Sequence, residues 1–257
     1  MMFRMVERCP LCDRDNSHHN YYGTLELREI FHKFGFDELI YAICECGLIF
    51  QWWAMTPESL AEYYKNIYRE MLGKSELASR DIKRERKRAK KIVQFLDESP
   101  NNALDIGCGA GALLVKLRDV YGCKVTGIEP DDNYREYSQG LGLNVLSDLE
   151  FLDGNRKFDL ITATHVLEHF IEPMPFLEKV RGLMSEEGKL ILEVPLMSPR
   201  LSHPIVFTEE TFREMLHKAG FGIDRLIVGK HRLVMGENLV AKAYIDTGDG
   251  ERGRIED

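Results

Sequence analysis

The sequence predicts an α/β fold, in which helices alternate with the strands of a mostly parallel sheet. Short apolar runs of strand-like composition recur between residues 102 and 245, and helical patterns separate them until the last pair. A glycine-rich turn joins the first run to the helix that follows it. This alternation of strand and helix is typical of parallel sheets. The expected strands are 102–106, 123–128, 143–147, 158–162, 189–194, 223–229 and 238–245.

The composition is that of a globular protein with a sizeable core. Hydrophobic residues make up 44% of the 257 residues and charged residues 30%, and no run approaches the ~18 apolar residues that a membrane-spanning helix needs. The first residues, MMFRMVER, carry charges where a signal peptide needs an apolar stretch. We therefore expect a cytoplasmic protein whose six cysteines are thiols or metal ligands rather than disulfides.

Four of these cysteines lie close to the start of the chain, in two pairs. They are Cys9, Cys12, Cys44 and Cys46. Two pairs of thiolates can complete a tetrahedron around Zn²⁺, and a fragment with strands expected only at 21–27 and 39–43 buries too little apolar surface to be stable alone. We predict a structural zinc ribbon over residues 1–55. Because the second pair has only one residue between its members, His18 or His19 could replace one sulfur, and reduced cysteines without a metal are the simpler alternative.

Two helices are expected between the ribbon and the sheet. Thr56 is a good N-cap before Pro57, and this helix runs to about residue 72 with Tyr63, Tyr64 and Tyr68 along it. A second helix spans about 75–96, with an apolar face at helical spacing. The organisation expected is therefore a ribbon at 1–55, a helical linker at 56–99, an α/β domain at 100–247 and a mobile tail at 248–257.

The second helix also has a basic face, formed by Arg80, Lys83, Arg84, Arg86, Lys87, Arg88, Lys90 and Lys91. This face could bind RNA or a phosphate-bearing substrate. A solvated helix face is favoured, because Asp81 and Glu85 dilute the patch, no RNA-binding motif accompanies it, and the net charge of the chain is -8.

The glycine-rich turn has the pattern G-x-G-x-G at Gly107, Gly109 and Gly111. It lets the backbone approach a ligand closely at the carboxyl end of a strand, and it is neither a P-loop nor a G-x-G-x-x-G fingerprint. Asp105 lies beneath the turn, where it can hold loop amides and lie near a ligand cation. Glu129 follows the second strand, where an acid can accept hydrogen bonds from ribose hydroxyls; its alternative role is to cap a helix after Pro130.

Five segments together resemble the class I S-adenosylmethionine-dependent methyltransferases. They are LDIGCGAGALL, GIEPD, FDLITATHVLEHF, KLILEVP and FTEETF…AGF, in the expected order over about residues 102–245. The resemblance implies a Rossmann-like, seven-stranded, mostly parallel sheet with an antiparallel last strand. The front end resembles the subgroup with an N-terminal zinc-binding segment, since residues 44–50, CECGLIF, fit its second cysteine pair with one residue deleted.

The resemblance also implies where S-adenosylmethionine binds. The cofactor-binding residues are expected to be Asp105, Gly107, Cys108, Gly109, Gly111, Glu129, Pro130, Asp148, Leu149, Thr164 and His165. In this set the glycine loop holds the methionine and ribose, Glu129 holds the ribose, and Asp148 accepts from the adenine amine or caps the turn that follows. Tyr64 and Tyr68, with Tyr63, could line the acceptor pocket, and packing in the core is the alternative for them.

Three side chains are candidates for catalysis. Glu168, His169 and His203 lie in segments that the resemblance places beside the acceptor, and a histidine there could take a proton from an acceptor hydroxyl or amine. The alternative is that these side chains only organise hydrogen bonds, because the sulfonium already makes the methyl group electrophilic and alignment can suffice.

The function expected from these observations is methyl transfer from S-adenosylmethionine to a small polar acceptor. A sugar, a nucleotide-sugar or a natural-product intermediate is favoured, with O- or C-methylation, and a structural Zn²⁺ in the ribbon. Neither a nucleic-acid nor a membrane partner is expected. An RNA methyltransferase is the first alternative, and a cofactor-binding scaffold without catalysis is the second.

Overall fold

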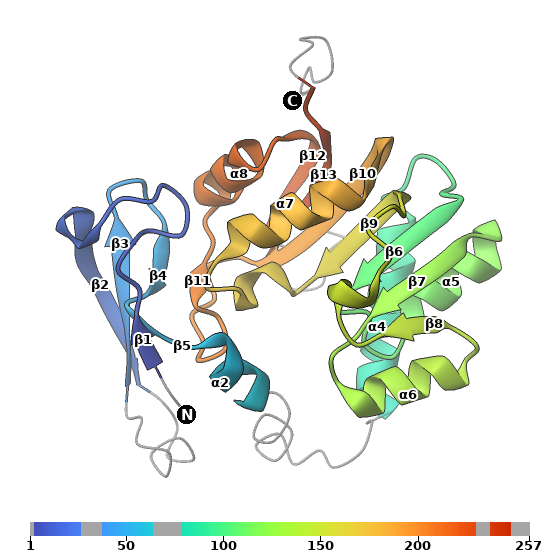
Figure 1. The fold of residues 1–257 in the computed structure, drawn as a ribbon, viewed down its shortest axis with the longest axis horizontal. Coiled ribbons are helices and arrows are strands. Elements are labelled where there is room, and N and C mark those ends of the chain that lie inside the picture. Colours follow the sequence, from blue (N-terminus) through green and yellow to red (C-terminus); the bar gives the residue numbers. More distant parts are fainter. Residues whose placement is uncertain (1–2, 27–37, 64–78, 230–236, 248–257) are drawn as a thin grey trace.

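The computed structural model describes residues 3–26, 38–63, 79–229 and 237–247. These residues form a small antiparallel sheet in the N-terminal part of the chain and a larger α/β part beside it (Figure 1). Tyr64, Tyr68 and the expected tail at 248–257 lie outside the described residues, as does most of the connection 229–236. Within the described ranges, no helix is long and apolar enough to span a membrane.

The α/β part is built on a seven-stranded sheet with the order β12-β13-β10-β9-β6-β7-β8. Its strands are β6 (Asn102–Ile106), β7 (Lys124–Ile128), β8 (Asn144–Leu146), β9 (Phe158–Thr164), β10 (Met184–Pro195), β12 (Phe221–Gly229) and β13 (Asn238–Ile245). Only β13 runs antiparallel to its neighbours, β10 and β12, among these strands. The mostly parallel sheet with an antiparallel last strand is thus confirmed.

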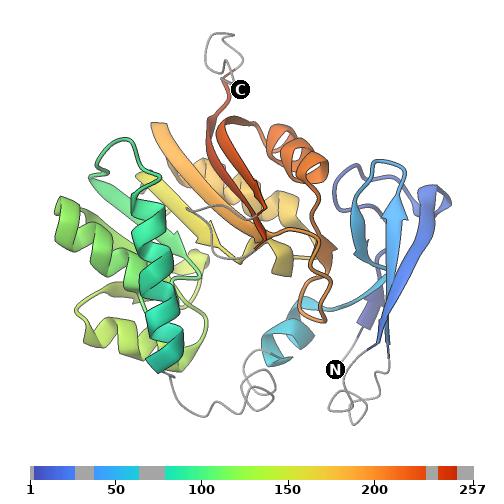
Figure 2. The ribbon, with the colours of Figure 1, turned by 180° about the vertical axis from the view of Figure 1, so that it is seen from behind.

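Helices cover both faces of this sheet (Figures 1 and 2). Helices α4 (Ser79–Val93) and α5 (Ala112–Tyr121) pack on one face through Ile92 and Leu117. Helices α7 (Pro173–Leu183) and α8 (Glu209–Lys218) pack on the other face, and α6 (Asp132–Gly140) lies beside β8. Helix α4, which the sequence assigns to a linker, is therefore part of the core of the α/β domain.

The helix caps follow the sequence pattern. Thr56 caps α2 (Pro57–Glu62) by accepting a hydrogen bond from the Ser59 amide. Thr208 caps α8 and forms a capping box with Thr211, and Gly220 follows the helix with φ +80°, in the left-handed region. Each cap satisfies amides or carbonyls that the helix itself leaves without a partner.

The N-terminal sheet takes one of its strands from the α/β domain. Its order is β11-β4-β3-β2, and its strands are β2 (His19–Glu26), β3 (Glu38–Cys44), β4 (Ile49–Gln51) and β11 (Ile205–Val206). A separate pair joins β1 (Phe3–Met5) to β5 (Trp53–Met55). Because β11 comes from the loop after β10, Phe50 of the small sheet and Phe212 of α8 are buried in one continuous core.

Candidate active site

The glycine loop joins β6 to α5 with three glycines in left-handed conformations. Gly107, Gly109 and Gly111 have φ values of 70°, 54° and 73°. A Cβ at Gly107 would lie 2.6 Å from Val166, and one at Gly111 would lie 2.4 Å from Leu143. Glycine is thus required both by the backbone conformation and by the close approach of neighbouring side chains.

Two carboxylates hold the amides of this loop. Glu129 accepts a hydrogen bond from the Gly109 amide at 2.8 Å, and Glu85 accepts one from the Ala110 amide at 2.9 Å. The expectation that Asp105 holds loop amides is corrected: its carboxylate accepts from the Thr162 hydroxyl at 2.6 Å, because that strand residue lies directly across the β6–β9 pair. Glu129 also accepts from the Asp131 amide, so it serves the turn before α6 as well.

Glu85 and Arg88 are site residues that the sequence interpretation missed. Both line a cavity of about 70 Å³ beside the glycine loop, together with Asp105, Gly107, Gly109 and Thr164. The sequence analysis placed Glu85 and Arg88 on the solvated basic face. Their spacing carried a signal, since both fall on the helical stripe of the buried Ala89 and Ile92.

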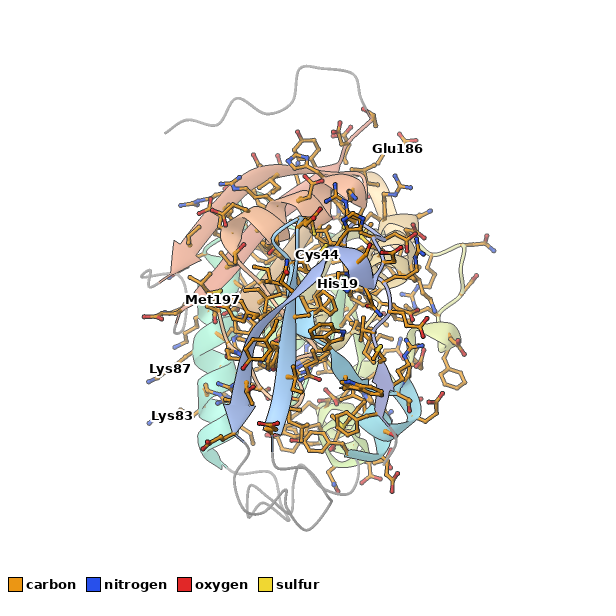
Figure 3. All side chains as sticks on the ribbon, turned by 90° about the vertical axis from the view of Figure 1, so that its left-hand side faces the viewer. His19, Cys44, Lys83, Lys87, Glu186 and Met197 are labelled. Atoms are coloured by element: carbon orange, nitrogen blue, oxygen red, sulfur yellow. The ribbon has the colours of Figure 1, made fainter. Side chains whose placement is uncertain are left out.

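Most cations that the structure describes on the basic face do point into solvent. Lys83 and Lys87 are exposed and extend outward from α4 (Figure 3). Arg84, Arg86 and Lys90 are exposed as well. The solvated-face interpretation therefore describes these five cations but not Arg88.

The electrostatics of the cavity favour a cationic ligand. Burial raises the pKa of Asp105 to about 7, and the Thr162 hydrogen bond opposes this only in part. Burial also raises the pKa of Glu85 to about 7, against the opposing effect of the Ala110 amide and with a smaller contribution from the nearby acids. Burial raises the pKa of Glu129 as well. A bound positive charge would stabilise the ionised form of these three carboxylates. A sulfonium cofactor with an amino-acid end fits this set, in which Arg88 offers the one cation lining the described cavity.

The remaining predicted cofactor residues lie around this centre. Thr164 lines the cavity at the end of β9, and Cys108 is buried within the loop. Asp148 caps the short 3-10 helix η3 (Leu149–Phe151) by accepting from the Glu150 amide at 2.8 Å, and its contact with adenine stays a prediction. Leu149 is half-buried against the core, and Pro130 is exposed.

A chain of charged groups leads from the cavity to the predicted catalytic side chains. Arg88 Nε lies 3.4 Å from Glu193 Oε2, and Glu193 Oε1 lies 3.6 Å from His165 Nε2. His165, whose φ of 57° is unusual for a residue other than glycine, then places its Nδ1 3.2 Å from Glu168 Oε1. The cavity beside the glycine loop and the cluster of candidate catalytic residues are thus connected through side chains.

The structure brings the three catalytic candidates together. Glu168 and His169 belong to the 3-10 helix η4 (Leu167–His169), and His203 precedes β11. Glu168 Oε1 lies 3.9 Å from His169 Nε2, and the two imidazole rings have centroids 5.0 Å apart. Burial lowers the pKa of His203 to about 4, so this ring is neutral near pH 7. Tyr63, in contrast, is buried with Met55 and Leu201, so its role is core packing.

The four N-terminal cysteines form a second cluster. The Sγ atoms of Cys9 and Cys46 are 3.5 Å apart, as are those of Cys12 and Cys44, and all four lie within 4.8 Å of one another. A tetrahedral zinc site with Zn–S bonds of about 2.3 Å places its sulfurs about 3.8 Å apart, so this set fits the metal. Figure 3 shows Cys44 and His19 in the ribbon.

Neither histidine near this cluster competes with the sulfurs. His18 Nδ1 lies 3.0 Å from a Glu45 carboxylate oxygen, and His19 bonds to Asn16 and to the Arg14 carbonyl. The four cysteines, rather than three with a histidine, are therefore the group that the fold assembles.

The sheet and the glycine loop define an α/β domain of the class that binds nucleoside ligands at the carboxyl ends of its strands. The family model described as a methyltransferase domain matches residues 80–226, which is more than half of the chain, and the chain belongs to this family. The match begins at α4, in agreement with the packing of that helix on the sheet.

Curated relatives match the same region. The ubiquinone biosynthesis O-methyltransferase of Coxiella burnetii is 32% identical over 112 residues, covering 40% of this chain and 47% of the relative. The tRNA U34 carboxymethyltransferase of Idiomarina loihiensis is 28% identical over 115 residues, covering 40% and 36%. The chain spans about half the length, or less, of these relatives.

Solved structures share the fold at lower identity. Magnesium protoporphyrin IX methyltransferase from Synechocystis, with bound SAH, superposes with a TM-score of 0.57 at 18% identity, over 74% of this chain and 100% of that one. The mitomycin 7-O-methyltransferase superposes with a TM-score of 0.52 at 20% identity, over 63% and 54%. At these identities the likeness concerns the fold.

Proposed function

We propose that this protein transfers the methyl group of S-adenosylmethionine to an oxygen of a small polar acceptor. The observation that carries the proposal is the set of buried acids around the glycine loop. Glu85 and Glu129 accept from amides of the loop, and Glu85 and Asp105 line the cavity beside it. Such a set would stabilise the positive sulfonium end of the donor. The relatives named as O-methyltransferases support oxygen as the acceptor atom.

The acceptor would approach from the side of Glu168, His169 and His203. These side chains lie at the same edge of the sheet as the glycine loop, and they are linked to the donor cavity through His165, Glu193 and Arg88. O-methylation requires that the acceptor hydroxyl lose its proton, and this cluster is the group that could promote that loss. A sugar, a nucleotide-sugar or a natural-product intermediate is the acceptor class we propose, whereas C-methylation would need a more acidic C–H bond.

The ribbon would contribute stability rather than chemistry. Its four thiolates can fill every position of a tetrahedral Zn²⁺ and leave none open for a substrate. Because the ribbon sheet includes β11, zinc would also hold the loop that carries His203. We therefore propose a structural zinc that indirectly positions the acceptor side of the site.

The proposal is tested first by calorimetric titration with S-adenosylhomocysteine, on the wild type and on Glu129→Ala. One-to-one binding is expected, weakened by about 1–3 kcal/mol when the carboxylate is lost. Glu136→Gln is the matched control, since Glu136 is an exposed acid on α6, and it should bind as the wild type does. Absence of binding to the folded wild type would contradict the proposal.

The second measurement is a methyl-transfer assay. The protein is incubated with S-adenosylmethionine and each of a set of polyhydroxylated and phenolic acceptors, and the formation of S-adenosylhomocysteine is measured. Transfer to a small acceptor would support the proposal. The competing function is RNA methylation, which is favoured by the exposed lysines of α4 and by the likeness to a tRNA-modifying enzyme. Bulk tRNA belongs in the same screen, and transfer to it that falls steeply with added salt would favour that alternative.

A further inference from the structure

We propose that Glu168, His169 and His203 together bind a divalent transition-metal cation, and this proposal rests on the methyl-transfer function proposed above. One ligand atom of each residue lies within 4.8 Å of the others. Two imidazoles and one carboxylate that converge in this way form a ligand set typical of divalent metal sites with open positions. Ligands of one cation lie about 3.0–3.5 Å apart when the bonds are about 2.1 Å, so small side-chain rotations would complete the site.

Both imidazoles are oriented as metal ligands are. His169 Nδ1 donates to the Ser202 carbonyl at 2.6 Å, and His203 Nδ1 donates to the Ser198 carbonyl at 2.8 Å. A carbonyl only accepts, so the proton is fixed on Nδ1 and each ring keeps Nε2 as its basic nitrogen. Hydrogen bonds of this kind are the usual second contact of metal-binding histidines, because they fix the tautomer and the orientation of the ring.

Glu168 supplies the negative charge of the site. Its side chain is only 1% exposed, and its Oε1 bonds to His165 at 3.2 Å. Its Oε2 is buried and has no hydrogen-bond partner among the described residues. An unpartnered carboxylate oxygen in a buried position is costly, and a bound cation would satisfy it.

The donor set selects the class of cation. Two imidazole nitrogens favour Zn²⁺ or Fe²⁺ over Mg²⁺ and Ca²⁺, which prefer oxygen ligands and water. The carboxylate and the open positions for oxygen ligands also allow Mn²⁺ to bind. The thiolates of the ribbon select zinc, so the two sites would differ in preference. Three protein ligands leave positions for an acceptor oxygen, and the site therefore fits an acceptor that binds the cation through the hydroxyl to be methylated.

A cation at this position would activate the acceptor by lowering the pKa of its hydroxyl, as a bound metal lowers the pKa of water to about 7. The acceptor O–H bond breaks and its proton passes to solvent. The oxygen then attacks the methyl carbon, the O–C bond forms and the C–S bond breaks. S-adenosylhomocysteine leaves as a neutral thioether that keeps the electron pair of the broken bond.

The test is a titration of the full chain with Mn²⁺, in which electron paramagnetic resonance measures the free ion. The chain is first loaded with one equivalent of Zn²⁺, which the four thiolates take up, so that the cluster of Glu168, His169 and His203 is left without zinc. Because Mn²⁺ binds thiolates far more weakly than Zn²⁺ does, the ribbon stays occupied by zinc. One bound Mn²⁺ per chain is expected. Glu168→Gln and His203→Asn should each weaken binding by about tenfold or more, since losing even the hydrogen-bond partner of a ligand costs about 10–100-fold. His217→Asn, which replaces an exposed histidine of α8, should bind Mn²⁺ as the wild type does.

Absence of Mn²⁺ binding by the zinc-loaded wild type would overturn the proposal, as would unchanged affinity in both cluster variants. If the variants fail to fold, pulsed electron paramagnetic resonance on the wild-type protein with bound Mn²⁺ shows whether histidines bind the ion. Nitrogen couplings from imidazole are expected, and their absence would overturn the metal site. S-adenosylhomocysteine binding, measured on the same preparation, separates the two proposals, because it would persist if only the metal site were wrong.

Discussion

Glu85→Gln should make the ligand-free protein more stable at high pH and leave its stability unchanged at low pH. The carboxylate lies against the glycine loop, where it accepts from the Ala110 amide and lines the cavity with Asp105. Glutamine keeps an oxygen that can accept the same hydrogen bond but carries no charge. The substitution therefore removes the electrostatic cost of ionising Glu85 and little else.

The size of the effect follows from the pKa of Glu85. Burial, helped by Asp105 and Glu129 and opposed by the Ala110 amide, raises this pKa from 4.5 to about 7 in the folded protein. Between these pH values the folded state holds a proton that the unfolded state has released. The free energy of unfolding of the wild type therefore falls by about 1.4 kcal/mol per pH unit over this range. The loss reaches up to about 3 kcal/mol at pH 7 and above and is absent below pH 4.5, and Glu85→Gln abolishes it.

Urea unfolding, followed by circular dichroism at pH 5, 6, 7 and 8, measures this difference. A fixed concentration of free zinc keeps the ribbon in the same state throughout. The advantage of Glu85→Gln should grow from about 0.7 kcal/mol at pH 5 to its full size at pH 8. Glu178→Gln, which alters an exposed acid on α7, should show no such growth. A pH-independent difference, or a variant that is less stable at pH 8, would refute the reasoning.

Three further predictions concern the donor, the loop and the ribbon. Because the pKa values of Glu85 and Asp105 are raised to about 7, the dissociation constant for cationic S-adenosylmethionine should fall by about tenfold from pH 6 to pH 8. Calorimetry should find a smaller change in the dissociation constant of S-adenosylhomocysteine. Equal changes for the two ligands would contradict the charge argument. Gly109→Ala should lower the free energy of unfolding by about 1–2 kcal/mol, because alanine is strained in the left-handed conformation of this residue. It should also weaken donor binding, since the added Cβ would lie 2.6 Å from Glu85 Oε1. Gly140→Ala is the control, because open space surrounds that residue, and it should change little. Cys44→Ser should lose zinc on dialysis, as measured by elemental analysis. Cys123→Ser should retain zinc, because Cys123 lies outside the cluster. Equal zinc contents in the two variants would rule out the four-sulfur site.

Much of the fold could be predicted because it depends on local chemistry. The strands β6 and β13 have the bounds expected from their apolar runs, and the caps at Thr56 and Thr208 follow from their side chains alone. Longer strands were harder to delimit. β10 begins at Met184 rather than near residue 189, because its first residues pair with β9 through a bulge that no sequence periodicity marks.

The candidate site could be predicted only where a motif carries it. The glycine loop and Glu129 stood out because a tight turn with left-handed φ values and an acid after the next strand leave a pattern in the sequence. Glu85 and Arg88 share the helical stripe of Ala89 and Ile92, but that stripe does not tell which element it meets, and only the structure shows that it faces the glycine loop. Asp105 was expected to hold loop amides, but the β6–β9 register places it opposite Thr162, and its carboxylate accepts from that hydroxyl instead.

The sequence by itself determined the class of the protein, the order of its elements, the glycine loop and the two pairs of N-terminal cysteines. Each of these depends on contacts between residues close in the chain or on a motif with a known geometry. Tertiary structure alone decided that β11 completes the ribbon sheet, that α4 closes the donor cavity and that Glu168, His169 and His203 meet. These features join segments far apart in the chain. Such contacts form when buried surfaces find complementary shapes, and the pattern of any one segment does not encode its partner.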